Sequence, residues 1–132
     1  MIDVRIQAGD FDPGRQLERL GELSCGALAS FTGLALAEDE VEAIHIDHYS
    51  ALAKTVLTGL AEKAEREWGL RGVILIHRHG RLAPGDRIAF AGVAANGQDE
   101  ALAATAFLAE ALRREAPFWR KELLAGGGSR WR

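Results

Sequence analysis

The feature that most constrains the fold is an amphipathic helix pattern that leads directly into a buried strand. Apolar residues recur at helical spacing from Leu52 to Trp68, with lysine, glutamate and arginine on the opposite face. Ser50 is a suitable N-cap, and Gly69 ends the pattern. The run 73–76 that follows is Val-Ile-Leu-Ile, which is typical of a strand covered on both faces. This succession predicts helices packed on a sheet.

The rest of the chain adds further strands and two more helices. Hydrophobic patterning predicts strands over 1–7, 25–36, 41–49 and 87–95. We expect the second of these strands to bend or bulge at Gly33. Helices are expected to begin at Asp12-Pro13 and to cover 98–115, where Pro117 ends the second one. We expect the strand 41–49 to pair with the strand before it. The order β-α-β-β-α-β-β-α predicts one α+β domain over 1–125 with a mainly antiparallel sheet, then a flexible tail over 126–132.

Composition excludes several classes of protein. The 132 residues are 48% hydrophobic and 27% charged, which is enough apolar material for one globular core and argues against a disordered or fibrous chain. No apolar run approaches the roughly 20 residues of a membrane span, and no secretory signal is visible at the start. The single cysteine, Cys25, cannot form an internal disulfide. These features favour a cytoplasmic protein.

Charge is distributed unevenly along the chain. Residues 1–112 hold 10 basic and 17 acidic residues, whereas residues 113–132 hold six basic and two acidic ones. An acidic body argues against general nucleic-acid binding. The basic end indicates either an anionic ligand or acidic partner, or simply a solvated terminus. We expect the acidic connection around Glu38–Glu42 to be solvated.

Candidate metal ligands and nucleophiles are weak. His77 and His79 would share one face of a strand and could supply two zinc ligands, but His45 and His48 point to opposite faces. No cysteine or carboxylate cluster completes a set of four, so we expect structural histidines and no metal site. Cys25 lacks a neighbouring base that would ionise it, which favours a buried small residue over a nucleophile.

The strongest local feature is the segment 112–122. Several cations flank Pro117 and the aromatic pair Phe118-Trp119. Arginine presents forked donors that suit phosphate or carboxylate groups. The segment is therefore either an anion-binding edge or a charged helix end.

Several blocks of sequence resemble the large, catalytic subunit of molybdopterin synthase, the MoaE family. They occur in that family's order and at nearly its spacing, and together they span about Ile2 to Trp131. The blocks are Ala29–Gly33 (ASFTG), Asp47–Tyr49 (DHY), Ile76–Asp86 (IHRHGRLAPGD), Ala116–Glu122 (APFWRKE) and Arg130-Trp131.

The resemblance implies a MoaE-like α/β hammerhead fold with an added antiparallel subdomain, and a homodimer. It implies that each subunit receives the thiocarboxylated tail of a ubiquitin-like sulfur carrier, MoaD. Sulfur then passes to cyclic pyranopterin monophosphate, precursor Z, without a metal or organic cofactor. By the same resemblance the carrier's tail would lie in a pocket formed by Phe31, Gly33, Phe118 and Trp119.

The sequence departs from the family where its active-site residues are expected. The two lysines of the family correspond here to Arg113 and Arg120, with Lys121 beside the second. A loop arginine corresponds to Leu36, and a His-Arg pair corresponds to Gly97-Gln98. The loop after Gly33 is also about three residues short.

Arg113, Arg120 and Lys121 are therefore the candidate catalytic residues, and Arg113, Arg120 and Arg130 are the candidate ligands for an anionic substrate. Arginine keeps the positive charge but cannot lose its proton as lysine can. Two hypotheses follow. The chain is a divergent synthase subunit, or it is an impaired paralogue that binds the carrier or forms a heterodimer with an active subunit. An unrelated anion-binding protein on the same scaffold is a third alternative.

Overall fold

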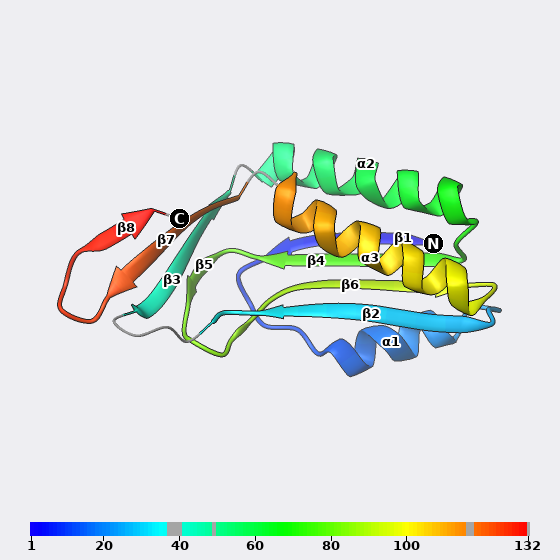
Figure 1. Cartoon of the computed structure of the whole chain (residues 1–132), viewed down its shortest axis with the longest axis horizontal. Coiled ribbons are helices and arrows are strands. Elements are labelled where there is room, and N and C mark those ends of the chain that lie inside the picture. The colour runs from blue at the N-terminus through cyan, green and yellow to red at the C-terminus, as the bar shows by residue number, and fades with distance from the viewer. Residues whose placement is uncertain (37–40, 49, 116–117, 132) are drawn as a thin grey trace.

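The chain folds into two four-stranded sheets joined end to end (Figure 1). Three helices pack on the sheet formed by β1, β4, β6 and β2. The computed structural model describes residues 1–36, 41–48, 50–115 and 118–131. The acidic residues 38–40 lie outside these ranges. No helix within them is both long enough and apolar enough to cross a membrane.

The first sheet has the strand order β1-β4-β6-β2. Its members are β1 (Ile2–Gln7), β4 (Gly72–Arg78), β6 (Arg87–Ala95) and β2 (Ala27–Leu34). Only β1 and β4 pair in parallel, and β6 pairs antiparallel with both β4 and β2. The pairing of β2 shifts between Gly33 and Leu34, which confirms the irregularity expected there.

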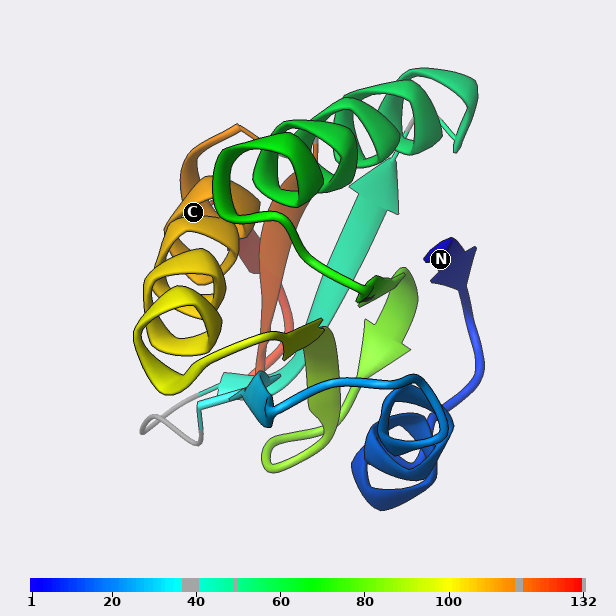
Figure 2. The ribbon, with the colours of Figure 1, turned by 90° about the vertical axis from the view of Figure 1, so that its right-hand side faces the viewer.

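The helices cover both faces of this sheet, as Figure 2 shows. One face carries α1 (Pro13–Gly21), and the other carries α2 (Ser50–Trp68) and α3 (Gln98–Arg114). Asp12 caps α1, because its carboxylate accepts hydrogen bonds from the backbone N–H groups of Gly14 and Arg15. The strand β4 is buried along almost its whole length, as its run of β-branched residues and leucine predicts.

The second sheet has the order β5-β3-β7-β8 and is entirely antiparallel. It consists of β3 (Val41–His48), β5 (Gly80–Leu82), β7 (Phe118–Leu124) and β8 (Ser129–Trp131). Gly80 has a φ of 92°, which only glycine adopts readily, and here the chain leaves β4 for β5. The antiparallel subdomain expected from the family resemblance is therefore present.

Three sequence-based expectations need correction. The strand β3 does not pair with β2, because it belongs to the second sheet and lies between β5 and β7. The strands β5, β7 and β8 were not expected. The segment 126–132, expected to be a flexible tail, contains β8, whose residues 129–131 pair with β7.

Candidate functional site

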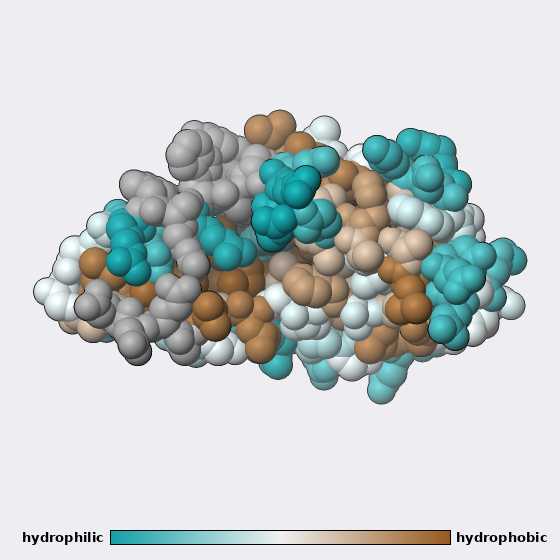
Figure 3. All heavy atoms as spheres, viewed as in Figure 1, coloured by the Kyte–Doolittle hydropathy of each residue, from teal (hydrophilic) through white to brown (hydrophobic). Residues whose placement is uncertain are grey.

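A pocket of about 820 Å³ opens where the two sheets meet. The first sheet contributes residues of β2, β4 and β6, the second contributes Ile44 of β3 and Arg120 of β7, and α3 forms a wall. Figure 3 shows hydrophilic residues over the C-terminal end of α3 and hydrophobic residues gathered below them, over the end of β2. The pocket therefore has a charged side and an apolar side.

Small residues leave this space open. The strand pairing places Ile6, His77, Ala89 and Gly33 in one row across the four strands of the first sheet. Two of these four have little or no side chain, and on α3 the pocket is lined by Ala106 and Ala109, one turn apart. Small side chains on both surfaces keep the helix from filling the end of the sheet.

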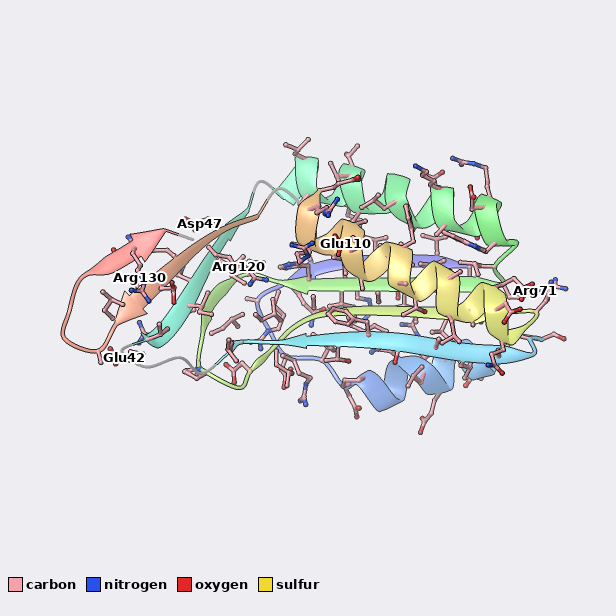
Figure 4. The ribbon with its side chains drawn as sticks, in the orientation of Figure 1. Glu42, Asp47, Arg71, Glu110, Arg120 and Arg130 are labelled. Carbon is pink, nitrogen blue, oxygen red and sulfur yellow. The ribbon has the colours of Figure 1, made fainter. Side chains whose placement is uncertain are left out.

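The cations predicted from the sequence converge on this pocket in part. Arg113 in the last turn of α3 and Arg120 on β7 both line it, although they come from different layers of the fold. In Figure 4, Arg120 lies close to the end of α3 that carries Glu110. The two positions singled out by the family resemblance thus face one space.

Glu110 also lines the pocket, and sequence reasoning missed it. Its Oε1 lies 2.5 Å from Nη2 of Arg113 and 2.6 Å from Nε of Arg114. The hydrogen bond from Arg113 holds the pKa of Glu110 below its usual range, and the same bond raises the pKa of Arg113. Its spacing of three and four residues from two arginines on a helix is the signal that could have found it.

Two other predicted cations do not line the pocket. Lys121 follows Arg120 along β7, and successive side chains of a strand point to opposite faces. Arg130 lies on β8 with its Nε 3.0 Å from Oε1 of the buried Glu122. Figure 4 places Arg130 farther from α3 than Arg120. The assignment of Arg130 as an anion ligand stays a prediction.

The residues predicted to receive the carrier's tail are divided in the same way. Phe31 and Gly33 line the pocket, and the ring of Phe31 lies 3.4 Å from where a Cβ on Gly33 would be. Phe118 and Trp119 begin β7. Their side chains lie outside what the structure describes, so their role as pocket residues also stays a prediction.

The remaining positions that the family resemblance implies, Leu36 and Gly97-Gln98, lie in two different places. Leu36 lines the pocket and is largely exposed. Gly97 caps the start of α3 and Gln98 is its first residue. Fifteen residues at 1.5 Å each separate Gln98 from Arg113, which is roughly 20 Å along the helix axis. Positions 97 and 98 are therefore at the opposite end of α3 from this pocket.

The histidines are the candidate metal ligands of the sequence, and Cys25 is its candidate nucleophile. His77 is buried and lines the pocket, whereas Nε2 of His45, on the interior strand β3 of the second sheet, lies 2.9 Å from Oδ1 of Asp47. Within the described ranges no group of three or more His, Cys, Asp or Glu residues is arranged to hold a metal ion. Cys25 is half-buried and packs beside the small core under α1.

Comparison with known proteins shows which family this sequence resembles. The model of the family described as MoaE protein matches residues 6–115. The chain belongs to the MoaE family. A molybdopterin synthase catalytic subunit from Cereibacter sphaeroides is 39% identical, with 94% of this chain and 87% of the relative covered.

Solved structures of MoaE-type proteins have the same fold. The molybdopterin biosynthesis MoaE protein from Burkholderia ambifaria superposes with a TM-score of 0.86 at 36% identity, covering 99% of this chain and 88% of that one. A subunit in a complex of subunits 1 and 2 of molybdopterin-converting factor from Helicobacter pylori gives a TM-score of 0.82 at 23% identity, covering 97% and 88%. The fold expected from the resemblance is confirmed.

Proposed function

We propose that this MoaE-family chain transfers sulfur from a thiocarboxylated MoaD-type carrier to precursor Z. The broader role, that of the molybdopterin synthase large subunit in molybdenum cofactor biosynthesis, follows from family membership. The observation that carries the finer proposal is the pocket at the junction of the two sheets. Two arginines from separate elements, Arg113 and Arg120, line it together with the glycine of the Phe-Thr-Gly motif.

The two arginines suit binding and orientation of anions. A guanidinium donates paired hydrogen bonds to phosphate or carboxylate oxygens and stays charged at any working pH. Arg113 and Arg120 would thus hold the substrate's phosphate or the carrier's terminal carboxylate. They would not act as nucleophiles or exchange protons, as lysines can in a desolvated site.

The alternative is an impaired paralogue that binds the carrier or pairs with an active subunit. Three observations favour it. Arginine stands at both positions where lysine is expected, leucine stands at position 36, and Glu110 already engages the guanidinium of Arg113. We infer this divergence by comparing the residues at positions 36, 113 and 120 with those that the family resemblance implies there.

The partners of the proposed function are a MoaD-type carrier and a second copy of this chain. The solved Helicobacter pylori structure is a complex of two subunits of a molybdopterin-converting factor, which supports a carrier partner. Exposed apolar side chains on the edge strand β2, Leu28 and Leu34, supply surface that an association would bury. Light scattering after size exclusion distinguishes a homodimer from a monomer.

The deciding experiment is reconstitution with purified thiocarboxylated carrier and precursor Z, with molybdopterin formation as the readout. The double variant Arg113→Lys plus Arg120→Lys is assayed beside the wild type. The matched control is Arg66→Lys on the exposed face of α2, which makes the same chemical change away from the pocket. Carrier binding is measured on the same samples by calorimetry.

Product from the wild type supports sulfur transfer without the lysine amines. No wild-type product with intact carrier binding supports the paralogue, and activity gained only in the double variant identifies the arginines as the cause. Failure to bind a carrier or an active large subunit would contradict both readings.

A further inference from the structure

The pocket at the junction of the two sheets contains a carboxylate beside its cations. Among the described residues that line it, Glu110 is the acidic side chain, and Arg113 and Arg120 are the basic ones. Oε2 of Glu110 lies 3.3 Å from Nε of Arg113, and Oε1 lies 2.5 Å from Nη2 of the same guanidinium. Glu110 therefore already accepts from the forked donors that suit a ligand's phosphate or carboxylate.

A second arginine keeps Glu110 at this place. Nε of Arg114 lies 2.6 Å from the same Oε1, and Arg114 is not among the residues that line the pocket. A ligand that displaces the carboxylate from Arg113 would leave it bound to Arg114. The negative charge of Glu110 therefore stays beside the bound ligand, because a glutamate is ionised at neutral pH.

The other side of the pocket is apolar. Phe31, Leu34 and Leu36 line it and are 39%, 57% and 61% exposed. A charged group bound between Arg113 and these side chains loses part of its hydration, and in a Born description this cost rises with the square of the charge. Both sides of the pocket thus disfavour a second negative charge on the ligand.

We propose that Glu110 determines the charge of the anion that this pocket accepts, so that Arg113 binds singly charged groups in preference to doubly charged ones. The inference deepens the proposed function and rests on it for the identity of the ligands. A terminal carboxylate has one negative charge, and a cyclic phosphate, which is a diester, also has one. A phosphate monoester has nearly two charges above its second pKa of about 6. The pocket would therefore accept the carrier's terminus and a cyclic phosphate and discriminate against phosphate monoesters.

The size of this selection follows from Coulomb's law. Two unit charges on one guanidinium, about 6 Å apart in a water-like medium, repel with an energy equivalent to about a 3-fold change in a dissociation constant. Glu110 would thus weaken a monoanion about 3-fold and a dianion about 10-fold. Release of the donors of Arg113 would strengthen both kinds of ligand alike. The ratio of the two affinities therefore isolates the charge of Glu110.

The test compares methyl phosphate, which is doubly charged at pH 8, with dimethyl phosphate, which is singly charged at that pH. Dissociation constants are measured at low salt by NMR titration of the backbone amide of Arg113 in the full chain. In Glu110→Gln we expect methyl phosphate to bind about 10-fold more tightly than in the wild type, and dimethyl phosphate about 3-fold. The matched control is Glu62→Gln on α2, an exposed residue that does not line the pocket, which should leave the ratio unchanged.

A second variant separates charge from shape. Glu110→Asp keeps the negative charge on the last turns of α3, so the ratio of the two affinities should stay near that of the wild type. Equal gains for both ligands in Glu110→Gln overturn the inference, because only the donors of Arg113 would then have been released. A ratio that changes as much in Glu110→Asp as in Glu110→Gln also overturns it. So does the absence of an Arg113 shift with either ligand in every variant.

Failure of this inference is distinguishable from failure of the proposed function. If the wild type forms no product from thiocarboxylated carrier and precursor Z, the proposed function fails, and the affinity ratio still measures the role of Glu110. If the wild type forms product and the ratio is the same in Glu110→Gln, sulfur transfer stands and Glu110 does not select the charge of the ligand.

Discussion

The ion pair between β7 and β8 allows a structural role for Arg130 to be separated from a role in anion binding. Glu122 has only 4% of its side chain exposed, and Nε of Arg130 lies 3.0 Å from its Oε1. Hydrogen bonds to charged groups contribute about 1.5–3 kcal/mol. The side chain of Arg130 is 49% exposed, so water screens the pair, and we expect Arg130→Gln to lower the free energy of unfolding by about 1–2 kcal/mol.

A double-mutant cycle tests this reasoning. Urea unfolding of Arg130→Gln, Glu122→Gln and the double variant should give a coupling energy of about 1–2 kcal/mol, because the loss of Arg130 matters less once Glu122 is neutral. Phosphate binding should be unchanged in Arg130→Gln and weaker in Arg120→Gln. A coupling below about 0.3 kcal/mol would refute the structural role. Equal weakening of phosphate binding in both arginine variants would instead place Arg130 in the anion site.

Three further predictions concern single positions. The hydrogen bond from Arg87 lowers the pKa of Asp10, so the ionised carboxylate stabilises the fold at pH values above its ordinary pKa of 3.8, and this stabilisation is lost as the pH falls below that value. In urea unfolding, Asp10→Asn should therefore have a lower free energy of unfolding than the wild type at pH 7, and the difference should vanish in acid. Gly26→Ala would place a Cβ 2.1 Å from a backbone carbonyl oxygen, and we expect thermal unfolding to show a loss of about 2–3 kcal/mol. Glu110→Gln should strengthen phosphate binding measured by calorimetry, because Arg113 is released from its carboxylate; unchanged or weaker binding would contradict its place in the anion site.

The sequence predicted the elements whose pattern is long and regular. The helical spacing from Leu52 to Trp68 and the alternation of 1–7 correspond to α2 and β1. The strand β7 was missed because its middle, Arg120-Lys121-Glu122, has no apolar alternation, and only pairing with β3 on one side and β8 on the other makes it a strand. Alternation also cannot tell which strand pairs with which, so β3 was assigned to the wrong neighbour.

The site was less predictable than the fold, for a related physical reason. Arg113 and Arg120 were singled out by family resemblance, but their convergence depends on the crossing of the chain from α3 to the second sheet. His77 was considered only as a metal ligand or a structural residue. Its place beside Ala89 and Gly33 depends on the register of β4, β6 and β2, and β2 is far from the other two in the sequence.

Proton transfer is what separates an active subunit from a binding paralogue. Arg113 and Arg120 provide the charge needed to hold an anion, and an anion site by itself is compatible with either reading. Sulfur transfer from a thiocarboxylate also requires a group that accepts a proton and returns it. In the described part of the pocket Glu110 is held in its ionised form by Arg113. Arg113 and Arg120 do not release their protons, so the choice between the two readings depends on whether the wild type forms product or only the variant Arg113→Lys plus Arg120→Lys does.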